Sequence, residues 1–398
     1  MGKIILIKPG NALVLFLMDA QGHPQMIQAS FWPGAEEILG SIYIGRVEEV
    51  VPGIQAAFVS IAPKQKVFLP LGECVRPLLV NRDYDGQLRQ GDEIVVQITG
   101  KAVKTKLPEA TARLSLPGTY CVCRMDSPRT SYSGKLKEET VNELKKALQE
   151  SQIPGRENYG FIIRTNARTL TDKEPLFSEM AKFTAVFDDL RQKYKTRTCH
   201  SCLYRSEPEL VRVLKGIPIE DYDDIVTDQE QICQLISPFL DVPVRYYQDP
   251  SLSLTALYSL NTHLSRALEK RVWLPGGGYL VIEPTEAMTV IDVNSGKASG
   301  DKRISKKNLY LQINLEAARE IARQLRLRNC SGMIMVDFIN MDSPEDKKTL
   351  MKALDEQLRR DQVETRLVDM TGLGIVEITR KKINRPLSDF FSPNIKLI

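Results

Sequence analysis

The sequence predicts a mixed α/β protein built from several domains. Its 398 residues, 42% hydrophobic and 26% charged, are enough to form two or more ordinary cores. Short strand-like runs separated by Gly and Pro follow one another from about residue 40 to residue 98, whereas helical and strand patterns alternate further along the chain. These two sequence patterns indicate a small β-barrel combined with α/β units.

The composition excludes several classes of protein. A net charge of +4 is only mildly basic, so any affinity for nucleic acid has to come from local patches. The longest apolar runs, residues 4–7 and 12–18, are too short to span a bilayer, and we expect no signal peptide and no membrane contact. Seven cysteines, an odd number with irregular spacing, fit reduced thiols and a cytoplasmic location.

The first part of the chain reads as strands and turns. The first 38 residues predict a short hairpin and a connector. Several short strands then suggest a barrel of the OB type, which binds single strands on exposed aromatic side chains. Within it, Phe58 taken alone reads as a core residue. The strands expected for the barrel are residues 41–51, 55–61, 67–71 and 93–98.

The middle of the chain alternates strands and helices. Arg164 and Thr165 directly follow an apolar run at the end of an expected strand. A guanidinium beside a hydroxyl is a good binding site for a terminal phosphate. Taken alone, Arg164 would be an ordinary surface arginine. Beyond residue 206 we expect helical segments and a strand at 242–247. The other expected elements are strands at 118–124 and 159–164 and helices at 138–151 and 173–195.

Two apolar runs that each end on an aspartate carry the strongest chemical signal. Asp292 ends one run and Asp337 the other, 45 positions later. An aspartate in so apolar a run should be paired, hydrogen-bonded or bound to a cation, because burying a bare carboxylate is costly. Mg²⁺ commonly takes one or two carboxylates and fills its other positions with water and phosphate oxygens. Asn294 shares the strand face of Asp292 and could orient it. The plainer alternative is that both aspartates cap loops or helices.

The segment between the aspartates is rich in positive charge. Residues 297–328 contain nine Lys or Arg against three acids, as a polyanionic substrate would require, although an isolated run of this kind is usually a solvated face. Apolar residues at helical spacing predict an amphipathic helix over residues 309–328. Around it we expect a hairpin at 272–274 and 279–282, a helix starting at Ser343, and strands at 365–369 and 375–379.

The chain resembles the ribonuclease E/G family of endoribonucleases. The resemblance rests on Ala287-Met-Thr-Val-Ile-Asp-Val-Asn-Ser295, on Asn314-Leu-Glu-Ala-Ala318 with Glu320-Ile-Ala-Arg-Gln-Leu-Arg-Leu-Arg328, and on Val336-Asp-Phe-Ile339. It extends from the amino-terminal strands to about Pro386.

The resemblance implies a domain layout. Residues 1–38 and 207–268 would form a discontinuous, structural RNase H-like domain. Residues 39–117 would be an inserted OB-fold that binds RNA, and residues 118–206 a 5′-phosphate sensor. Residues 269–386 would form a DNase I-like α/β catalytic domain, with 387–398 as a tail.

The resemblance also implies roles for particular residues. Asp292 and Asp337 would hold one Mg²⁺, with Asn294 orienting Asp292 and Arg328 contacting phosphate. RNA would contact Phe58, Phe68 and Lys106. A 5′-monophosphate would lie among Gly118, Val122, Arg164 and Thr165. The implied activity is hydrolysis of single-stranded RNA to products with 5′-phosphates, in RNA processing and mRNA decay.

The chain departs from the family pattern at several points. A further sensor arginine is replaced near Gly134, with Lys135 beside it, and a phosphate-side arginine is replaced near Glu364, with Arg366 two residues on. After Pro386 the sequence has no paired-cysteine motif, so we expect no zinc link, and any homodimer would be held in another way. The losses leave a catalytically weakened, RNA-binding regulator as the alternative.

One pair of cysteines has metal-ligand spacing. Cys199 and Cys202 form half of a zinc site, and no second pair lies nearby. We expect plain thiols there, with a zinc shared between protomers as the open alternative.

Overall fold

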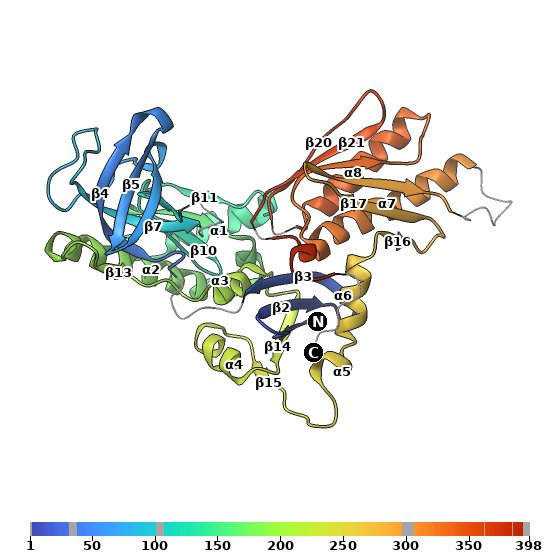
Figure 1. Cartoon of the computed structure of the whole chain (residues 1–398), viewed down its shortest axis with the longest axis horizontal. Coiled ribbons are helices and arrows are strands. Elements are labelled where there is room, and N and C mark those ends of the chain that lie inside the picture. Colours follow the sequence, from blue (N-terminus) through green and yellow to red (C-terminus); the bar gives the residue numbers. More distant parts are fainter. Residues whose placement is uncertain are drawn as a thin grey trace. The chain divides into compact units, whose positions relative to one another are not determined.

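The computed structural model describes residues 2–31, 38–100, 107–296, 306–361, 363–383 and 385–392. The chain divides into two compact units, one formed by residues 1–32 and 220–398 and the other by residues 33–219 (Figure 1). The predicted mixed α/β class is correct. No helix in these described ranges is long and apolar enough to cross a membrane.

The unit of residues 33–219 contains the predicted barrel. Strand β7 pairs with both β8 and β4, which closes five strands in the order β4-β5-β6-β8-β7. Gly45 is required inside it, because a Cβ there would lie 2.4 Å from Val59 Cγ1. β13 (Cys202–Tyr204) adds to β4 outside the ring. The barrel strands are β4 (Ile42–Val51), β5 (Ala56–Ala62), β6 (Gln65–Pro70), β7 (Glu93–Gly100) and β8 (Glu109–Thr111).

A second, smaller sheet lies in the same unit. Its order is β11-β12-β10-β9, and Phe161 and Ile163 of β12 share one core with Leu144 of α1 and with Met180 and Phe187 of α2. α3 (Glu209–Gly216) belongs to this unit too, which extends to residue 219. The other elements are β9 (Ser115–Pro117), β10 (Cys121–Arg124), β11 (Thr130–Tyr132), β12 (Gly160–Ile163), α1 (Glu138–Glu150) and α2 (Glu174–Lys193).

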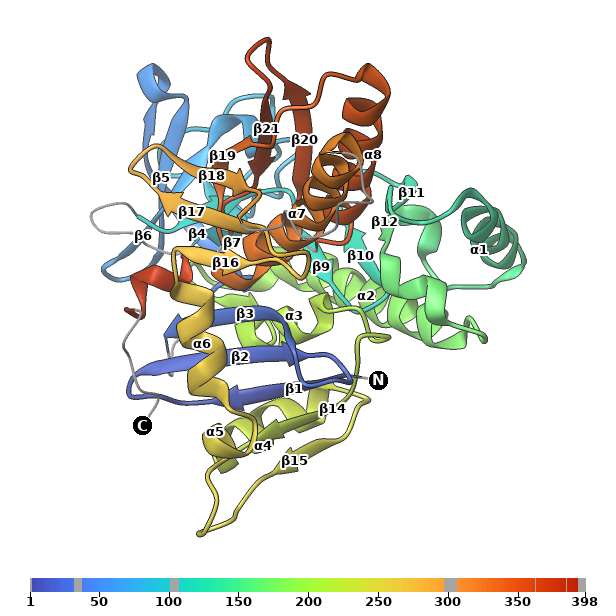
Figure 2. The same ribbon diagram turned by 90° about the vertical axis from the view of Figure 1, so that its right-hand side faces the viewer.

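The first sheet of the other unit joins distant parts of the chain. Its order is β15-β14-β1-β2-β3, and β1 pairs in parallel with β14, more than 200 residues later. The expected amino-terminal hairpin gains a third strand, and β14 was not expected at all. Figure 2 shows α6 crossing beside β2 and β3, and the apolar residues of α5 and α6 share their core. The elements are β1 (Gly2–Ile7), β2 (Ala12–Met18), β3 (Pro24–Phe31), β14 (Tyr222–Thr227), β15 (Val244–Tyr246), α4 (Glu230–Ile236), α5 (Leu254–Leu257) and α6 (Leu260–Leu268).

The second sheet of this unit carries both aspartates. Its order is β16-β17-β18-β19-β21-β20, and α7 connects the parallel strands β18 and β19. Apolar residues of α7 and α8 cover one face of the sheet, while Val290 and Met333 on the other face are 40% and 49% exposed. Ser343 accepts from Asp346 N and starts α8 as predicted. The elements are β16 (Arg271–Trp273), β17 (Tyr279–Pro284), β18 (Met288–Asn294), β19 (Gly332–Asp337), β20 (Thr365–Met370), β21 (Ile375–Arg380), α7 (Lys306–Arg328) and α8 (Pro344–Leu358).

Candidate active site

Asp292 and Asp337 lie directly opposite each other on neighbouring parallel strands. The pairing of β18 with β19 aligns Ile291 with Val336 and Asp292 with Asp337, at the carboxyl ends of both strands. Side chains at paired positions project from the same face, and neighbouring strands are about 4.8 Å apart. The two carboxylates are therefore close enough to bind one cation between them.

Asn294 fixes the first of these carboxylates. It follows Asp292 by two residues on the same strand, and its Nδ2 donates to Asp292 Oδ2 over 2.7 Å. This contact restricts the rotation of the Asp292 carboxylate and leaves its other oxygen available. The positioning role predicted for Asn294 thus has a hydrogen bond behind it.

Neither aspartate is buried, so the expectation that each needs a partner because of burial is wrong. Both carboxylates stand on the exposed face of the sheet, while Ile291 and Val336 point to the covered face. The runs look continuously apolar because the exposed face also carries apolar side chains such as Val290 and Met333. Burial therefore does not require that Asp292 or Asp337 be paired.

The donor set suits a hard divalent cation that keeps most of its own ligands. Within the described residues, no cluster of three or more His, Cys, Asp or Glu could hold a metal. The aspartate pair supplies two carboxylates on an open face, which matches the way Mg²⁺ is held by one or two carboxylates and shared with substrate phosphates. Softer metals such as zinc need three or four protein ligands.

The basic field expected beside the aspartates is only partly described. Residues 297–305 lie outside the described part of the chain. Further along α7, both guanidinium Nε and Nη2 of Arg323 donate to the Pro24 carbonyl, and its Nη1 bonds Glu320. Arg323 therefore anchors α7 to β3 instead of facing a substrate.

Arg328 is not near the aspartate pair. It ends α7, four residues before β19 begins, whereas Asp337 is the last residue of that strand, roughly 16 Å further along. Its side chain is buried, donates from Nε to Gln324 and from Nη2 to the Glu269 carbonyl, and burial lowers its pKa. The expected phosphate contact is thus not supported by its position, because its donors hold the end of the helix.

Arg366 does not take the place of the missing phosphate-side arginine. It pairs with Glu364. The register places Arg366 opposite Thr379 and Thr379 opposite Met333, at the far end of the sheet from Asp337.

The two predicted aromatic residues meet on the barrel. Phe58 of β5 is directly opposite Phe68 of β6, and their rings stand edge to face with centroids 6.1 Å apart. Both rings are partly exposed and lie outside the barrel core. Phe58 is therefore not a core residue of the barrel, contrary to its interpretation when taken alone. Partly exposed rings of this kind can stack on bases. Lys106 lies outside the described residues.

Two of the predicted sensor residues, Arg164 and Gly118, are in contact. Arg164 Nη1 donates to the Gly118 carbonyl, and Arg164 N donates to the Tyr120 carbonyl over 2.7 Å. Burial lowers the pKa of the Arg164 guanidinium, and the neighbouring Glu179 carboxylate acts in the opposite direction. Val122 lies on β10 of the same sheet, paired with Ile162.

Thr165 points to a different neighbour. Its hydroxyl is 3.1 Å from Ser133 Oγ, beside Gly134. The space around the Gly134 Cα is open, since no atom lies within 4 Å of a Cβ built there. Gly134, where we expected a further sensor arginine to be replaced, therefore leaves space for a side chain.

Glu179, which was not predicted as a site residue, holds the backbone of this loop in place. Its carboxylate accepts from three successive backbone amides, those of Thr119, Tyr120 and Cys121, over 2.6, 2.8 and 2.9 Å. A Cβ at Gly118 would lie 2.3 Å from this carboxylate, so only glycine fits there. As one acid on an amphipathic helix, Glu179 looks solvent-exposed until the loop is placed against it.

Comparisons with known proteins cover both the aspartate pair and the loop at Gly118. The Ribonuclease E/G family model matches residues 115–383, more than half of the chain. The chain belongs to the ribonuclease E/G family. It is 33% identical to ribonuclease G of Escherichia coli K12 over 87% of its own length and 73% of that protein. It is 32% identical to ribonuclease E of Nostoc over 89% of its length but only 52% of that protein, so it spans about half of this relative.

The cysteine pair of this ribonuclease E/G family member lies beside the barrel. Cys202 is exposed on β13 and Cys199 is half-buried, with its pKa raised by burial. His200 between them is engaged elsewhere, with Nε2 3.0 Å from Ser60 Oγ. The prediction of plain thiols stays a prediction.

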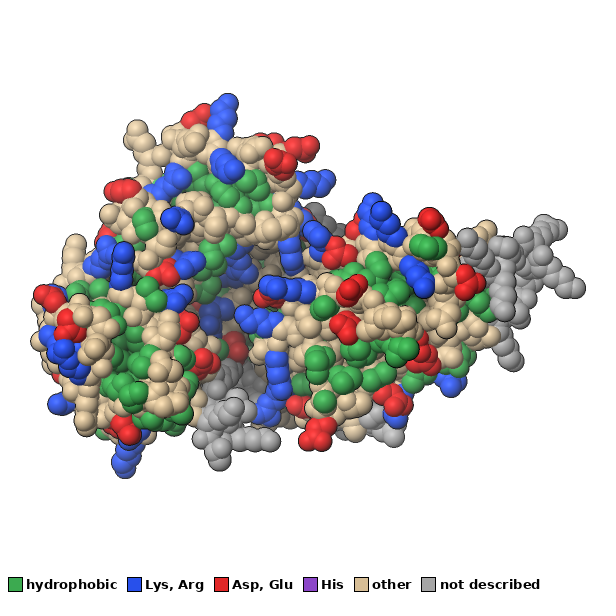
Figure 3. All heavy atoms as spheres, turned by 90° about the horizontal axis from the view of Figure 1, so that it is seen from above, with side chains coloured by type: hydrophobic (Ala, Val, Ile, Leu, Met, Phe, Trp, Pro, Cys, Tyr) green, Lys and Arg blue, Asp and Glu red, His purple; other side chains and the backbone are tan. Residues whose placement is uncertain are grey.

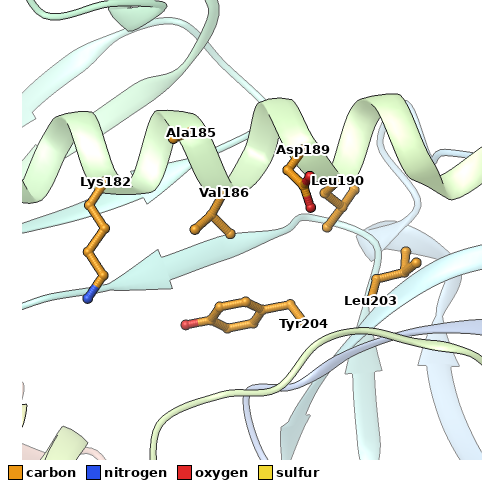
Figure 4. Close-up of a pocket in the computed structure, with 7 residues that line it drawn as sticks. All are labelled: Lys182, Ala185, Val186, Asp189, Leu190, Leu203 and Tyr204. Atoms are coloured by element: carbon orange, nitrogen blue, oxygen red, sulfur yellow. The ribbon is translucent and has the colours of Figure 1, made fainter. Parts of the chain in front are cut away.

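Two surface features of this family member lie apart from the predicted sites. A cavity of about 440 Å³ between α2 and β13 is lined by Lys182, Val186, Leu190, Leu203 and Tyr204, among others (Figure 4). It contains none of the predicted site residues. Basic and acidic side chains are interspersed over the face in Figure 3, as the small net charge implies.

Proposed function

We propose that this chain is a Mg²⁺-dependent endoribonuclease that hydrolyses phosphodiester bonds in single-stranded RNA. One observation carries the proposal: the sheet register aligns Asp292 with Asp337, and Asn294 is hydrogen-bonded to the first of them. Relatives named ribonuclease E and ribonuclease G support cleavage of RNA.

The three residues at the aspartate pair would have different roles. Asp292 and Asp337 would hold the cation, which when bound would polarise the scissile phosphate and lower the pKa of a water ligand. Asn294 keeps the Asp292 carboxylate turned toward the shared site. Because both carboxylates stand on an exposed face, an extended RNA strand would reach them without any opening of the sheet.

We further propose that the 5′ end of the substrate is read by the loop at Gly118. Arg164 and Thr165 would contact a 5′-monophosphate, with Val122 beside it, and Phe58 and Phe68 would stack on unpaired bases. Such a preference fits an enzyme of RNA processing and mRNA decay in the cytoplasm. The preference should be modest, because Gly134 supplies no second guanidinium.

The products test the proposed chemistry. Hydrolysis assisted by a metal should stop in a chelator, return with Mg²⁺, and leave 5′-phosphate and 3′-hydroxyl ends that a poly(A) polymerase can extend. Products ending in 2′,3′-cyclic phosphate, formed equally well in chelator, would contradict the proposal. Binding of unpaired RNA without any cleavage would instead favour the RNA-binding regulator. This alternative is worth testing because Arg328 and Arg366 both lie away from the aspartate pair.

A further inference from the structure

Two aromatic rings and an arginine form a cluster on the sheet that carries Asp292. The rings of Trp273 on β16 and Tyr279 on β17 are tilted, with centroids 5.2 Å apart. The Arg271 guanidinium lies 4.6 Å from the centroid of Tyr279 and 5.7 Å from that of Trp273. Trp273 is nevertheless 64% exposed, so most of this large side chain faces solvent.

The strand register places this cluster beside the aspartates and on their face. One row of paired residues runs from Arg271 through Val281 and Asp292 to Asp337. The next row runs from Trp273 through Tyr279 to Asn294. With strands about 4.8 Å apart, Tyr279 is one strand from Asn294, and Arg271 is roughly 10 Å from Asp292.

We propose that Arg271, Trp273 and Tyr279 form a nucleotide-binding subsite for the RNA segment next to the scissile phosphate. Trp273 stacks on a base, Tyr279 supports it, and Arg271 contacts the adjoining backbone phosphate. The inference rests on the proposed function, because only cleavage at the aspartate pair makes this the neighbouring nucleotide.

The chemistry of the cluster favours RNA over a protein partner. An arginine stacked on rings keeps its N–H edges free for a phosphate, and an indole face accepts any base. A distance of about 10 Å from Asp292 corresponds to between one and two nucleotides of an extended strand. The subsite also supplies the positive charge that Arg328 and Arg366 do not bring to this face. A second copy of the chain, docking on the exposed Trp273 at the edge strand β16, is the rival occupant.

Tryptophan fluorescence reports on the subsite directly. The chain contains only two tryptophans, so Trp32→Phe leaves Trp273 as the single indole. Titration with an unpaired oligonucleotide, with Ca²⁺ in place of Mg²⁺ to slow cleavage, should quench this fluorescence to saturation. A duplex of the same sequence should not quench it.

Cleavage kinetics distinguish stacking from support of the fold. Trp273→Leu removes the ring but keeps an apolar side chain, and should raise KM roughly tenfold or more, while Trp273→Phe should restore most of the affinity. Tyr246→Ala removes another exposed aromatic side chain, 43% accessible, from β15 of the same unit and should change neither kcat nor KM. An abasic residue at the position that stacks on Trp273 should weaken binding to wild-type protein but not to Trp273→Leu. An abasic residue at a position that stacks on Phe58 or Phe68 should weaken binding to both proteins equally.

The outcomes separate this inference from the proposed function. Mg²⁺-dependent cleavage with no quenching and an unchanged KM in Trp273→Leu would overturn the subsite and leave the ribonuclease intact. Quenching that depends on protein concentration without RNA, together with a monomer–dimer shift abolished by Trp273→Leu, would show that the cluster binds a second copy. Saturable quenching in a protein that never cleaves would preserve RNA binding here while refuting the ribonuclease.

Discussion

Asn294 donates a hydrogen bond of 2.7 Å to the carboxylate of Asp292, two residues earlier on β18. Since Asp292 is exposed, nothing else in the described structure is shown to fix its rotamer. The contact therefore separates two functions, ligation by Asp292 and orientation by Asn294, which substitution can test independently.

Replacing Asn294 should weaken use of the metal more than it weakens RNA binding. Residues that orient a metal ligand typically contribute tenfold to a hundredfold in affinity or activity. We expect Asn294→Ala to raise the Mg²⁺ concentration that gives half-maximal cleavage by about that factor, as measured by titrating Mg²⁺ at saturating RNA. An unchanged Mg²⁺ dependence would show that the hydrogen bond has no such role. Thr379→Ala, at the far end of the sheet, is a matched control.

The paired rings on the barrel should contribute to RNA affinity. Base stacking is worth about 1–3 kcal/mol per base, so Phe58→Ala and Phe68→Ala should each weaken binding of an unpaired oligonucleotide by roughly fivefold to a hundredfold. Fluorescence anisotropy measures this loss. Ile54→Ala, which removes an apolar side chain 56% exposed between β4 and β5, should have no effect. If all three variants bind RNA with wild-type affinity, Phe58 and Phe68 have a purely structural role.

Arg164 should carry the preference for a 5′-monophosphate. Charge-assisted hydrogen bonds are worth about 1.5–3 kcal/mol, and Arg164→Ala should therefore erase most of the rate difference between 5′-monophosphate and 5′-hydroxyl substrates. Gly134→Arg should increase that difference, because the Gly134 Cα faces open space beside Thr165. Arg129→Ala, an exposed arginine in the same unit, is the control. If the two substrates are cut at equal rates by wild type, the loop is not a sensor.

Glu179 should matter for the same preference without contacting RNA. Its carboxylate holds three amides of the loop after Gly118, so Glu179→Ala leaves these donors without their partner and lets the loop move. We expect lower thermal stability and loss of 5′-end discrimination, with unchanged cleavage of substrates carrying a 5′-hydroxyl. If discrimination rose instead, the carboxylate would be competing with phosphate for the amides.

The sequence was most informative where local pattern and fold agree. The strands around Asp292 and Asp337, the helix between them and the Ser343 cap were all predicted close to their observed bounds, because apolar periodicity and capping residues act locally. Four of the five barrel strands were predicted for the same reason, whereas β8, which pairs with β6 and β7 in the closed ring, was not predicted.

The remainder depended on contacts between distant segments. Strand β14 carries two acids and gains its place only by pairing with β1 and β15. Two hydrogen-bonded contacts likewise join residues about 60 positions apart: Arg328 donates to the Glu269 carbonyl, and Glu179 accepts from three backbone amides. The row from Arg271 to Asp337 exists only once the sheet order is known. No periodicity encodes such relationships.

The most direct test is cleavage of an unpaired 5′-monophosphorylated oligonucleotide in Mg²⁺ by wild-type protein, Asp292→Asn and Asp337→Asn. Each amide variant keeps the shape of the carboxylate but removes its charge, so both should lose cleavage by at least a thousandfold while retaining their thermal melting temperature and RNA affinity. Asp369→Asn, an exposed aspartate on β20 of the same sheet, should cleave normally. Full activity in either Asp292→Asn or Asp337→Asn would contradict the proposal that this pair holds the catalytic metal.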